Sequence, residues 1–142
     1  MKKTLHIALL LSCAITFAGC KDNSPPEVPD AELVGTLWTL ESIEVPGEPD
    51  FLPVTTQATS LKFLEDYRFE GHLDCNSYYG NYTLTDGDSI QVDIQFITEM
   101  LCGTSNDGNY LVHIRAVDSY GIIGNQLRLQ YNNSVLKYRY ME

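Results

Sequence analysis

The sequence predicts a mostly β fold of the α+β class: seven or eight short antiparallel strands in a curved sheet or barrel-like arrangement, with one helix. Apolar residues alternate with polar ones along most of the chain after residue 34. Hairpin signals such as Asp86-Gly87 separate the alternating runs, and one segment has helical spacing instead. A length of 142 residues with 44% hydrophobic residues supports one domain with an adequate core.

The first half of the predicted domain is a series of strands. The stretch 45–57 interrupts it as a loop, because it is rich in Pro and Gly, and Glu65-Asp66 marks a turn. Within each strand, one set of residues is expected to share a face: Trp38, Leu40 and Ser42; Leu61 and Phe63; Tyr67, Phe69, Gly71 and Leu73; Tyr82 and Leu84; Ile90, Val92, Ile94 and Phe96.

The second half contains the helix. Tyr110, Leu111, Ile114 and Val117 fall at helical spacing, which predicts a helix over about 107–118, with Asn106 or Asp107 as its N-cap. Two more strands are expected around a turn at Asn132-Asn133. Their alternating residues are Leu127, Leu129 and Tyr131, then Leu136, Tyr138 and Tyr140.

The first twenty residues are typical of an export signal. Lys2 and Lys3 precede an apolar stretch that is shorter than the roughly 20 residues of a membrane span. The segment Phe17-Ala18-Gly19-Cys20 resembles a bacterial lipobox, in which the Cys carries the lipid, although Phe17 stands where Leu is usual. We therefore expect residues 1–19 to be a lipoprotein signal peptide, residues 20–33 to be the lipidated Cys20 and a Pro-rich tether, and residues 34–142 to be the domain.

The residue after Cys20 indicates whether the lipid anchor lies in the inner or the outer membrane. It is Lys21, not the Asp that retains lipoproteins in the inner membrane, so we expect a lipid anchor in the outer membrane with the domain periplasmic or surface-exposed. The tether that follows has a reach of about 35–40 Å. Removal of Lys2 and Lys3 with the signal would take the formal net charge from −10 to −12, which argues against nucleic-acid binding. The expected partners are the membrane and an unidentified protein or small-molecule ligand, and the expected state is a monomer.

The four cysteines have different expected fates. Cys13 leaves with the signal and Cys20 is lipidated, so Cys75 and Cys102 remain. In an oxidising envelope we expect these two to form a disulfide, and two buried free thiols are the alternative. The closed loop of about 28 residues would contribute roughly 3–4 kcal/mol in the loop-entropy model.

Three ordered motifs are similar to those of META domains, the family of the heat-shock protein HslJ. They are an opening Gly-x-x-Trp, a central Gly…Cys-Asn-x-Tyr-x-Gly-x-Tyr and a later Thr-x-Met-x-Cys. The residues that carry them are Gly35, Trp38, Gly71, Cys75, Asn76, Tyr78, Gly80, Tyr82, Thr98, Met100 and Cys102. The resemblance covers about 34–142 and implies a compact antiparallel β domain with one helix, often lipid-anchored and linked to envelope stress. It brings no catalytic residues, so the Cys and Asn are expected to be determinants of the fold.

Neither catalysis nor metal binding is expected. His72, Asp74, Cys75 and Asn76 lie close in sequence and suggest a thiol nucleophile, but strand geometry turns Cys75 away from the His and Asp. Asp86 and Asp88 flank a turn without an EF-hand frame. His72 and His113 are too few for a zinc site, so we expect no metal, no cofactor and no catalytic residue.

The preferred hypothesis is a non-enzymatic outer-membrane lipoprotein with a role in envelope stress or protective binding. Two alternatives stay open. Clustered tyrosines and Gly35-x-x-Trp38, one residue longer than the lipocalin Gly-x-Trp opening, suggest a lipocalin-like carrier of a small ligand. The strong negative charge suggests an inhibitor of a basic hydrolase such as lysozyme.

Overall fold

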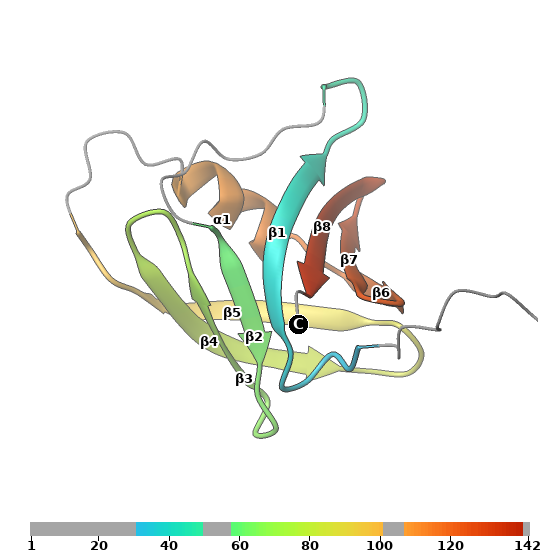
Figure 1. The fold of residues 1–142 in the computed structure, drawn as a ribbon, viewed down its shortest axis with the longest axis horizontal. Helices are drawn as coiled ribbons and strands as arrows, with labels where there is room; N and C mark the ends of the chain where they lie inside the picture. Colours follow the sequence, from blue (N-terminus) through green and yellow to red (C-terminus); the bar gives the residue numbers. More distant parts are fainter. Residues whose placement is uncertain (1–30, 50–57, 101–106, 141–142) are drawn as a thin grey trace, which may run out of the picture.

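The computed structural model describes residues 31–49, 58–100 and 107–140 (Figure 1). Eight antiparallel strands form one sheet in the order β5-β4-β3-β2-β1-β8-β7-β6, which confirms the predicted fold class. The strands are β1 Leu37–Glu44, β2 Ser60–Phe63, β3 Arg68–His72, β4 Ser77–Leu84, β5 Ile90–Ile97, β6 Ser119–Ile123, β7 Gln126–Tyr131 and β8 Ser134–Tyr140. The helix α1 spans Asp107–Arg115.

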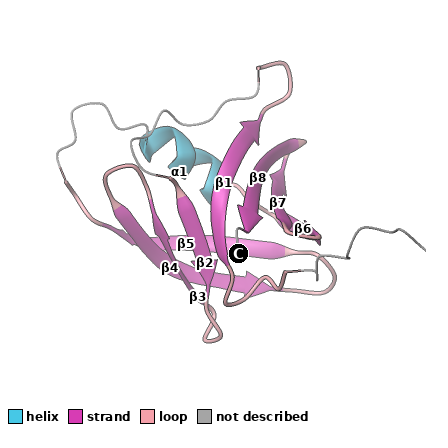
Figure 2. Ribbon diagram, in the orientation of Figure 1, coloured by secondary structure: helices cyan, strands magenta, loops and turns pink. Residues whose placement is uncertain are grey.

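The sheet consists of two meanders joined by the pairing of β1 with β8. It curls into a half-barrel, so that its two edge strands, β5 and β6, approach each other (Figure 2). The Ile90 amide donates to the Asp118 carbonyl oxygen at 3.1 Å, and the Tyr120 amide donates to that of Asp88 at 2.8 Å. The helix, which connects β5 to β6, packs against β5. The half-barrel is therefore joined at one point of its seam and covered by α1 beside it.

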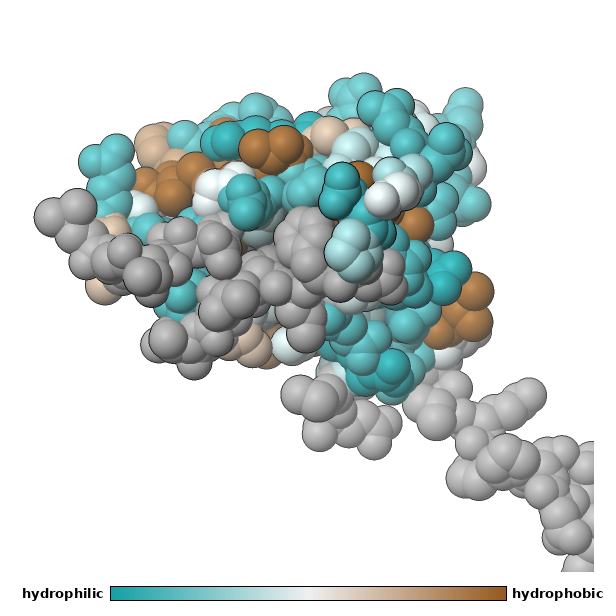
Figure 3. Space-filling model, turned by 90° about the horizontal axis from the view of Figure 1, so that it is seen from above, coloured by the Kyte–Doolittle hydropathy of each residue, from teal (hydrophilic) through white to brown (hydrophobic). Residues whose placement is uncertain are grey.

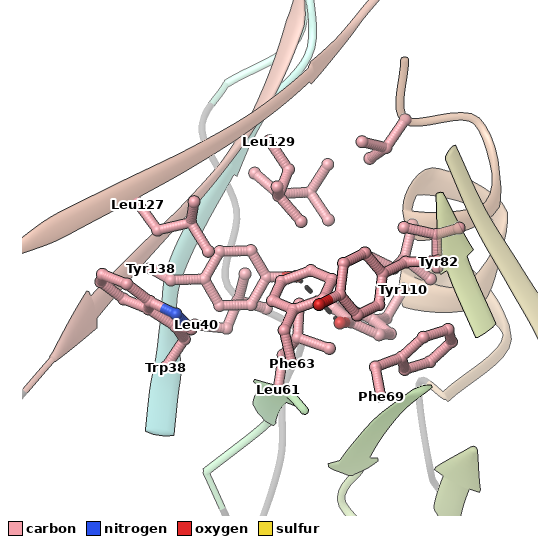
Figure 4. Close-up of a cluster of buried hydrophobic side chains, with 14 of the residues drawn as sticks. Trp38, Leu40, Leu61, Phe63, Phe69, Tyr82, Tyr110, Leu127, Leu129 and Tyr138 are labelled. Atoms are coloured by element: carbon pink, nitrogen blue, oxygen red, sulfur yellow. Dashed lines mark hydrogen bonds between the residues drawn. The ribbon is translucent and has the colours of Figure 1, made fainter. Parts of the chain in front are cut away.

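Large aromatic side chains fill the interior of the curled sheet (Figure 4). The six largest fully buried ones are Trp38, Tyr78, Tyr110, Tyr138, Phe63 and Phe69. Burial of each such side chain contributes about 1.5–3 kcal/mol, and they touch edge to face or at a tilt, as in the Phe63–Tyr82 and Tyr78–Tyr110 pairs. The core thus takes its side chains from both meanders and from the helix.

Two β-bulges change which residues face this core. In β1 the register skips Glu41, so Leu40 pairs with Tyr138 and Ser42 pairs with Lys137. Ile43 then points inward and is fully buried, whereas Ser42 is only half-buried. The prediction that Ser42 shares the inward face of Trp38 and Leu40 is therefore wrong, because an extra residue reverses the alternation.

The second bulge lies between β4 and β5. Tyr79 pairs with Phe96 and Gly80 pairs with Ile94, which leaves Gln95 as the extra residue. Phe96 consequently projects from the outer face and is 70% exposed, although its alternation with Ile94 predicts an inward side chain. The bulge thus places an aromatic side chain on the surface beside Tyr79.

Two other expectations need correction. Tyr67 does not share the face of Phe69, because it closes the β2–β3 turn with a φ of 60° and is 62% exposed. The helix ends at Arg115 rather than near residue 118, since the Asp118 amide instead donates to the Gln130 carbonyl oxygen at 2.9 Å. Strand β6 has no alternation of buried and exposed residues, since its first four residues are half-buried and Ile123 is exposed, so the sequence pattern does not mark it as a separate strand. The Asn132-Asn133 hairpin turn is confirmed, with φ values of 43° and 65°.

Gly80 makes the second bulge possible, and substitution there should be costly. A Cβ at this position would lie 2.0 Å from the Asp93 carbonyl oxygen and 2.8 Å from the Phe69 ring. We expect Gly80→Ala to lower the free energy of unfolding by about 1–3 kcal/mol or more, measured by urea denaturation. The matched control is Gly121→Ala in β6, where a Cβ meets no atom within 4 Å. That variant should be neutral or slightly stabilising, and equal losses in the two variants would contradict this account.

Candidate functional site

Three tyrosine hydroxyl groups form a buried chain inside the half-barrel (Figure 4). Tyr78 comes from β4, Tyr110 from α1 and Tyr138 from β8. The hydroxyl oxygen of Tyr110 lies 2.6 Å from that of Tyr78 and 2.8 Å from that of Tyr138. The Tyr78 hydroxyl donates its hydrogen to the Ser60 carbonyl oxygen at 3.0 Å. Since a hydroxyl has one hydrogen, Tyr78 must accept from Tyr110, and Tyr110 must accept from Tyr138. The three hydrogen bonds therefore all point the same way, from Tyr138 toward Ser60, and each hydroxyl hydrogen has an acceptor.

The position of the Tyr78 ring depends on a glycine in the neighbouring strand. Gly71 pairs directly with Tyr78 across β3 and β4. A Cβ on Gly71 would lie 2.3 Å from the Tyr78 ring, so the ring lies flat over the space that a side chain would occupy. This pairing directs the hydroxyl toward Ser60 and Tyr110, and it explains why a motif glycine and a motif tyrosine occur together.

The chemistry of the buried chain is that of neutral hydroxyl groups. Burial raises the pKa of Tyr78, Tyr110 and Tyr138 well above that of an exposed phenol, and the Coulombic effect of a neighbouring phenol raises each pKa further. None of the three can release a proton near neutral pH, so they act as structural hydrogen-bond partners rather than as acids or bases.

Asn76 connects three separate segments through its side chain. Its Oδ1 accepts hydrogen bonds from the Met100 amide at 2.8 Å and from the Thr98 hydroxyl at 3.2 Å. Its Nδ2 donates to Oδ2 of Asp107, the first residue of α1, at 2.9 Å. The Ser77 amide also donates to the Thr98 hydroxyl oxygen, at 2.9 Å. One amide side chain therefore ties the start of β4 to the segment after β5 and to the helix.

The residues that suggested a thiol nucleophile do not converge. The His72 ring nitrogen Nδ1 lies 3.0 Å from the Ser77 hydroxyl, whereas Sγ of Cys75 lies 3.5 Å from the Met100 carbonyl oxygen. Asn76 is occupied by the contacts described above. Cys102 lies outside the described residues, as does Cys20, so the disulfide and the lipid attachment stay predictions.

The remaining motif residues have structural positions. Gly35 has a φ of +84° and its amide donates to the Phe63 carbonyl oxygen at 2.8 Å. The buried Trp38 donates its indole hydrogen to the Leu33 carbonyl oxygen at 3.2 Å. The Tyr82 hydroxyl donates to the Leu64 carbonyl oxygen at 2.9 Å, whereas the Met100 side chain is exposed. The motif thus serves mainly to join the rim of the half-barrel to its core.

The outer surface carries charged pairs and exposed aromatics. Glu41 pairs with Arg139, whose hydrogen bonds lower the pKa of the Glu41 carboxyl group, and Glu44 pairs with Lys137. The face in Figure 3 is mostly hydrophilic, with small, separate hydrophobic areas. A hollow of about 410 Å³ lies over β3, β4 and β5, where Tyr79 and Phe96 line it. Sequence patterns missed this pair, since only the skipped Gln95 brings Phe96 to the outer face.

Metal and membrane-spanning features are absent from the described parts of the chain. Residues 31–49, 58–100 and 107–140 contain no group of three or more His, Cys, Asp or Glu side chains placed to hold a metal ion. Within the same ranges, no helix has the length and hydropathy needed to cross a bilayer.

The buried tyrosines should make the protein sensitive to alkali. Above pH about 10 the unfolded chain releases phenolic protons that the folded chain retains, so the free energy of unfolding should fall as pH rises. Each of the three tyrosines contributes a slope of about 1.4 kcal/mol per pH unit, measurable by urea denaturation across this range. Tyr138→Phe should reduce the combined slope by about a third. Ordinary phenol ionisation of all nine tyrosines in the folded protein would contradict this expectation.

The Asn76 contacts also have a specific test. Asn76→Asp keeps both accepted hydrogen bonds but sets a carboxylate against that of Asp107, so we expect a loss of about 1–3 kcal/mol in the free energy of unfolding. Adding Asp107→Asn restores a donor on the other side of the same contact. Chemical denaturation should show that the double variant recovers most of the loss, and no recovery would mean that this hydrogen bond is unimportant.

Comparison with solved structures supports the fold. A protein from Burkholderia xenovorans, determined by NMR, is 22% identical, with 77% of this chain and 83% of that one covered and a TM-score of 0.65. A DUF4847 family protein from Bacteroides vulgatus, determined by crystallography, is 10% identical in sequence. The match covers 75% of this chain and 93% of that one, with a TM-score of 0.56. At these identities the similarity concerns the fold alone.

Sequence comparison gives the family. No curated protein matches the chain significantly. The model of the META domain family matches residues 31–140, which include both meanders, the helix and all three motifs. This chain therefore belongs to the META domain family.

Proposed function

We propose that this protein is a lipid-anchored component of the bacterial cell envelope whose META domain binds its partner at its surface, without catalysis, in a protective or stress-related role. The observation that carries the proposal is the filled interior. Six large aromatic side chains are fully buried there, and their three hydroxyl groups bond to one another and to Ser60. A domain of this kind offers its outer surface, rather than an internal cavity, for recognition.

The filled interior favours surface binding over the lipocalin-like alternative. A carrier needs space inside its barrel for the ligand. Here Tyr110 of α1 reaches across the interior to hydroxyls on β4 and β8, and its ring lies 5.6 Å from that of Tyr78. Opening such a space would break hydrogen bonds between fully buried groups, which costs about 1–3 kcal/mol for each group left unpaired.

The chemistry of the described side chains favours binding over catalysis. General acids and bases usually have a pKa near the working pH. The buried phenols have a pKa far above it, and the best nucleophile candidate, Cys75, lies against the Met100 carbonyl oxygen rather than against His72. Desolvation lowers the pKa of His113, whose Nδ1 contacts the Tyr131 hydroxyl.

The start of the domain is compatible with a tether to a membrane. The Ala31 amide donates to the Gly124 carbonyl oxygen, in the turn between β6 and β7, at 3.0 Å. Ten residues separate this contact from Cys20 in the sequence, enough for a reach of about 30 Å when extended. An anchor at Cys20 would thus hold the domain near a bilayer while leaving the outer face of β3, β4 and β5 accessible.

Metabolic labelling tests the anchor. Cells that express the full chain with radioactive palmitate should yield a labelled, membrane-associated band, because acyl chains attached to Cys20 bury many CH2 groups, each contributing about 0.8 kcal/mol. Cys20→Ala should abolish both the label and the membrane association.

The matched control is Cys13→Ala, since Cys13 lies in the same export signal but is expected to leave with it. This variant should be labelled like the wild type. A Cys20→Ala band that keeps its label would refute lipidation at this residue and, with it, the proposed anchor.

A further inference from the structure

The hollow over β3, β4 and β5 has the form of a shallow ligand site. Its volume of about 410 Å³ lies within the range of about 300–1,000 Å³ that is usual for small-molecule sites. Tyr79 and Phe96 pair directly across β4 and β5 and are 44% and 70% exposed. Two large apolar side chains next to each other on the outer face of a sheet cost free energy in water, and a ligand that covers them recovers it.

The backbone supports this aromatic pair rigidly. Gln95 is the extra residue of the bulge, and Phe96 faces outward only because of it. The bulge in turn requires Gly80, where the Asp93 carbonyl oxygen approaches too closely for any side chain. The aromatic side chains therefore stand on paired strands, not on a loop, so the backbone that presents them is in place before a ligand arrives.

Polar groups surround the pair without a net charge. Arg68, Glu70, Asn81 and Gln95 line the same hollow. Arg68 is paired with Asp66 at 2.5 Å, and Glu70 lies opposite Lys62 in the register of β2 and β3. Gln95 donates one hydrogen bond to Asp93 at 3.3 Å. Within the described ranges, no hydrogen bond is formed by the side-chain amide of Asn81, which can therefore donate to and accept from a ligand.

We propose that this hollow is a binding site for neutral carbohydrate, with a sugar ring against Tyr79 and Phe96 and its hydroxyl groups bonded to Asn81, Arg68 and Glu70. The C–H face of a sugar ring is apolar and slightly positive, so it complements the negative face of an aromatic ring. The hydroxyl groups at its edge both donate and accept hydrogen bonds. They can therefore pair with an amide side chain, which does both, and with a carboxylate, which only accepts.

The charges favour a neutral sugar over other ligands. One arginine and one glutamate in the hollow cancel, while the chain as a whole carries a formal net charge of −10 that repels anions such as nucleic acids or acidic glycans. The inference deepens the proposed surface-binding role by naming its ligand, and it does not depend on the lipid anchor.

The test is a titration of the mature full chain in sugar-free detergent micelles with chitotriose, maltotriose and mannotriose, followed by calorimetry. We expect saturable binding of at least one of these neutral trisaccharides. Phe96→Ala and Tyr79→Ala should each weaken that binding at least about tenfold, because each removes an exposed stacking surface without disturbing the core. Phe96→Tyr keeps the aromatic face and should bind like the wild type.

Ile123→Ala is the matched control, since Ile123 is 73% exposed but lies in β6, outside the hollow. Its affinity should be unchanged. Absence of binding to all three trisaccharides, or equal binding by wild type and Phe96→Ala, would overturn the proposal. Self-association that Phe96→Ala abolishes, without sugar binding, would also overturn it and assign the surface to a second copy. These results are independent of palmitate labelling, so a failure here leaves the proposed anchor intact.

Discussion

The hydroxyl group of Tyr110 is the contact on which the rest of the domain depends. It joins Tyr78 of the first meander to Tyr138 of the second, and it comes from the helix that connects them. Polar groups buried this deeply are stable only when each is paired, so the sheet must curl until both strands lie within hydrogen-bond reach of the helix. The curvature of the half-barrel and the position of α1 together satisfy this requirement.

The same requirement explains the placement of glycines in the β3–β4 hairpin. Tyr78 reaches Ser60 and Tyr110 only because Gly71 leaves room for its ring, and Phe69 packs beside Gly80 for a similar reason. Close packing of these rings therefore requires glycine, which has no side chain, on the neighbouring strands. Gly80 also admits the bulge that turns Phe96 outward, so the packing of the interior determines which aromatic residues reach the surface.

The family motif and the surface have different roles. Most motif residues lie in the core or at its rim, where Asn76 ties three segments together and Trp38 bonds to Leu33. These contacts stabilise the domain and leave few groups for chemistry. The proposed recognition surface lies outside the motif, on the face where Tyr79 and Phe96 stand beside polar side chains.

The sequence by itself determined the class of fold, the single helix, the hairpin turn at Asn132-Asn133 and the family, because alternation, helical spacing and turn chemistry act over a few neighbouring residues. It also indicated that Asn76 and Tyr78 are structural. Only the tertiary structure decided that Ser42 and Phe96 leave the core, since a bulge arises from the fit between two strands and reverses every later side chain. The candidate site depends on that reversal, which a local pattern of residues does not contain.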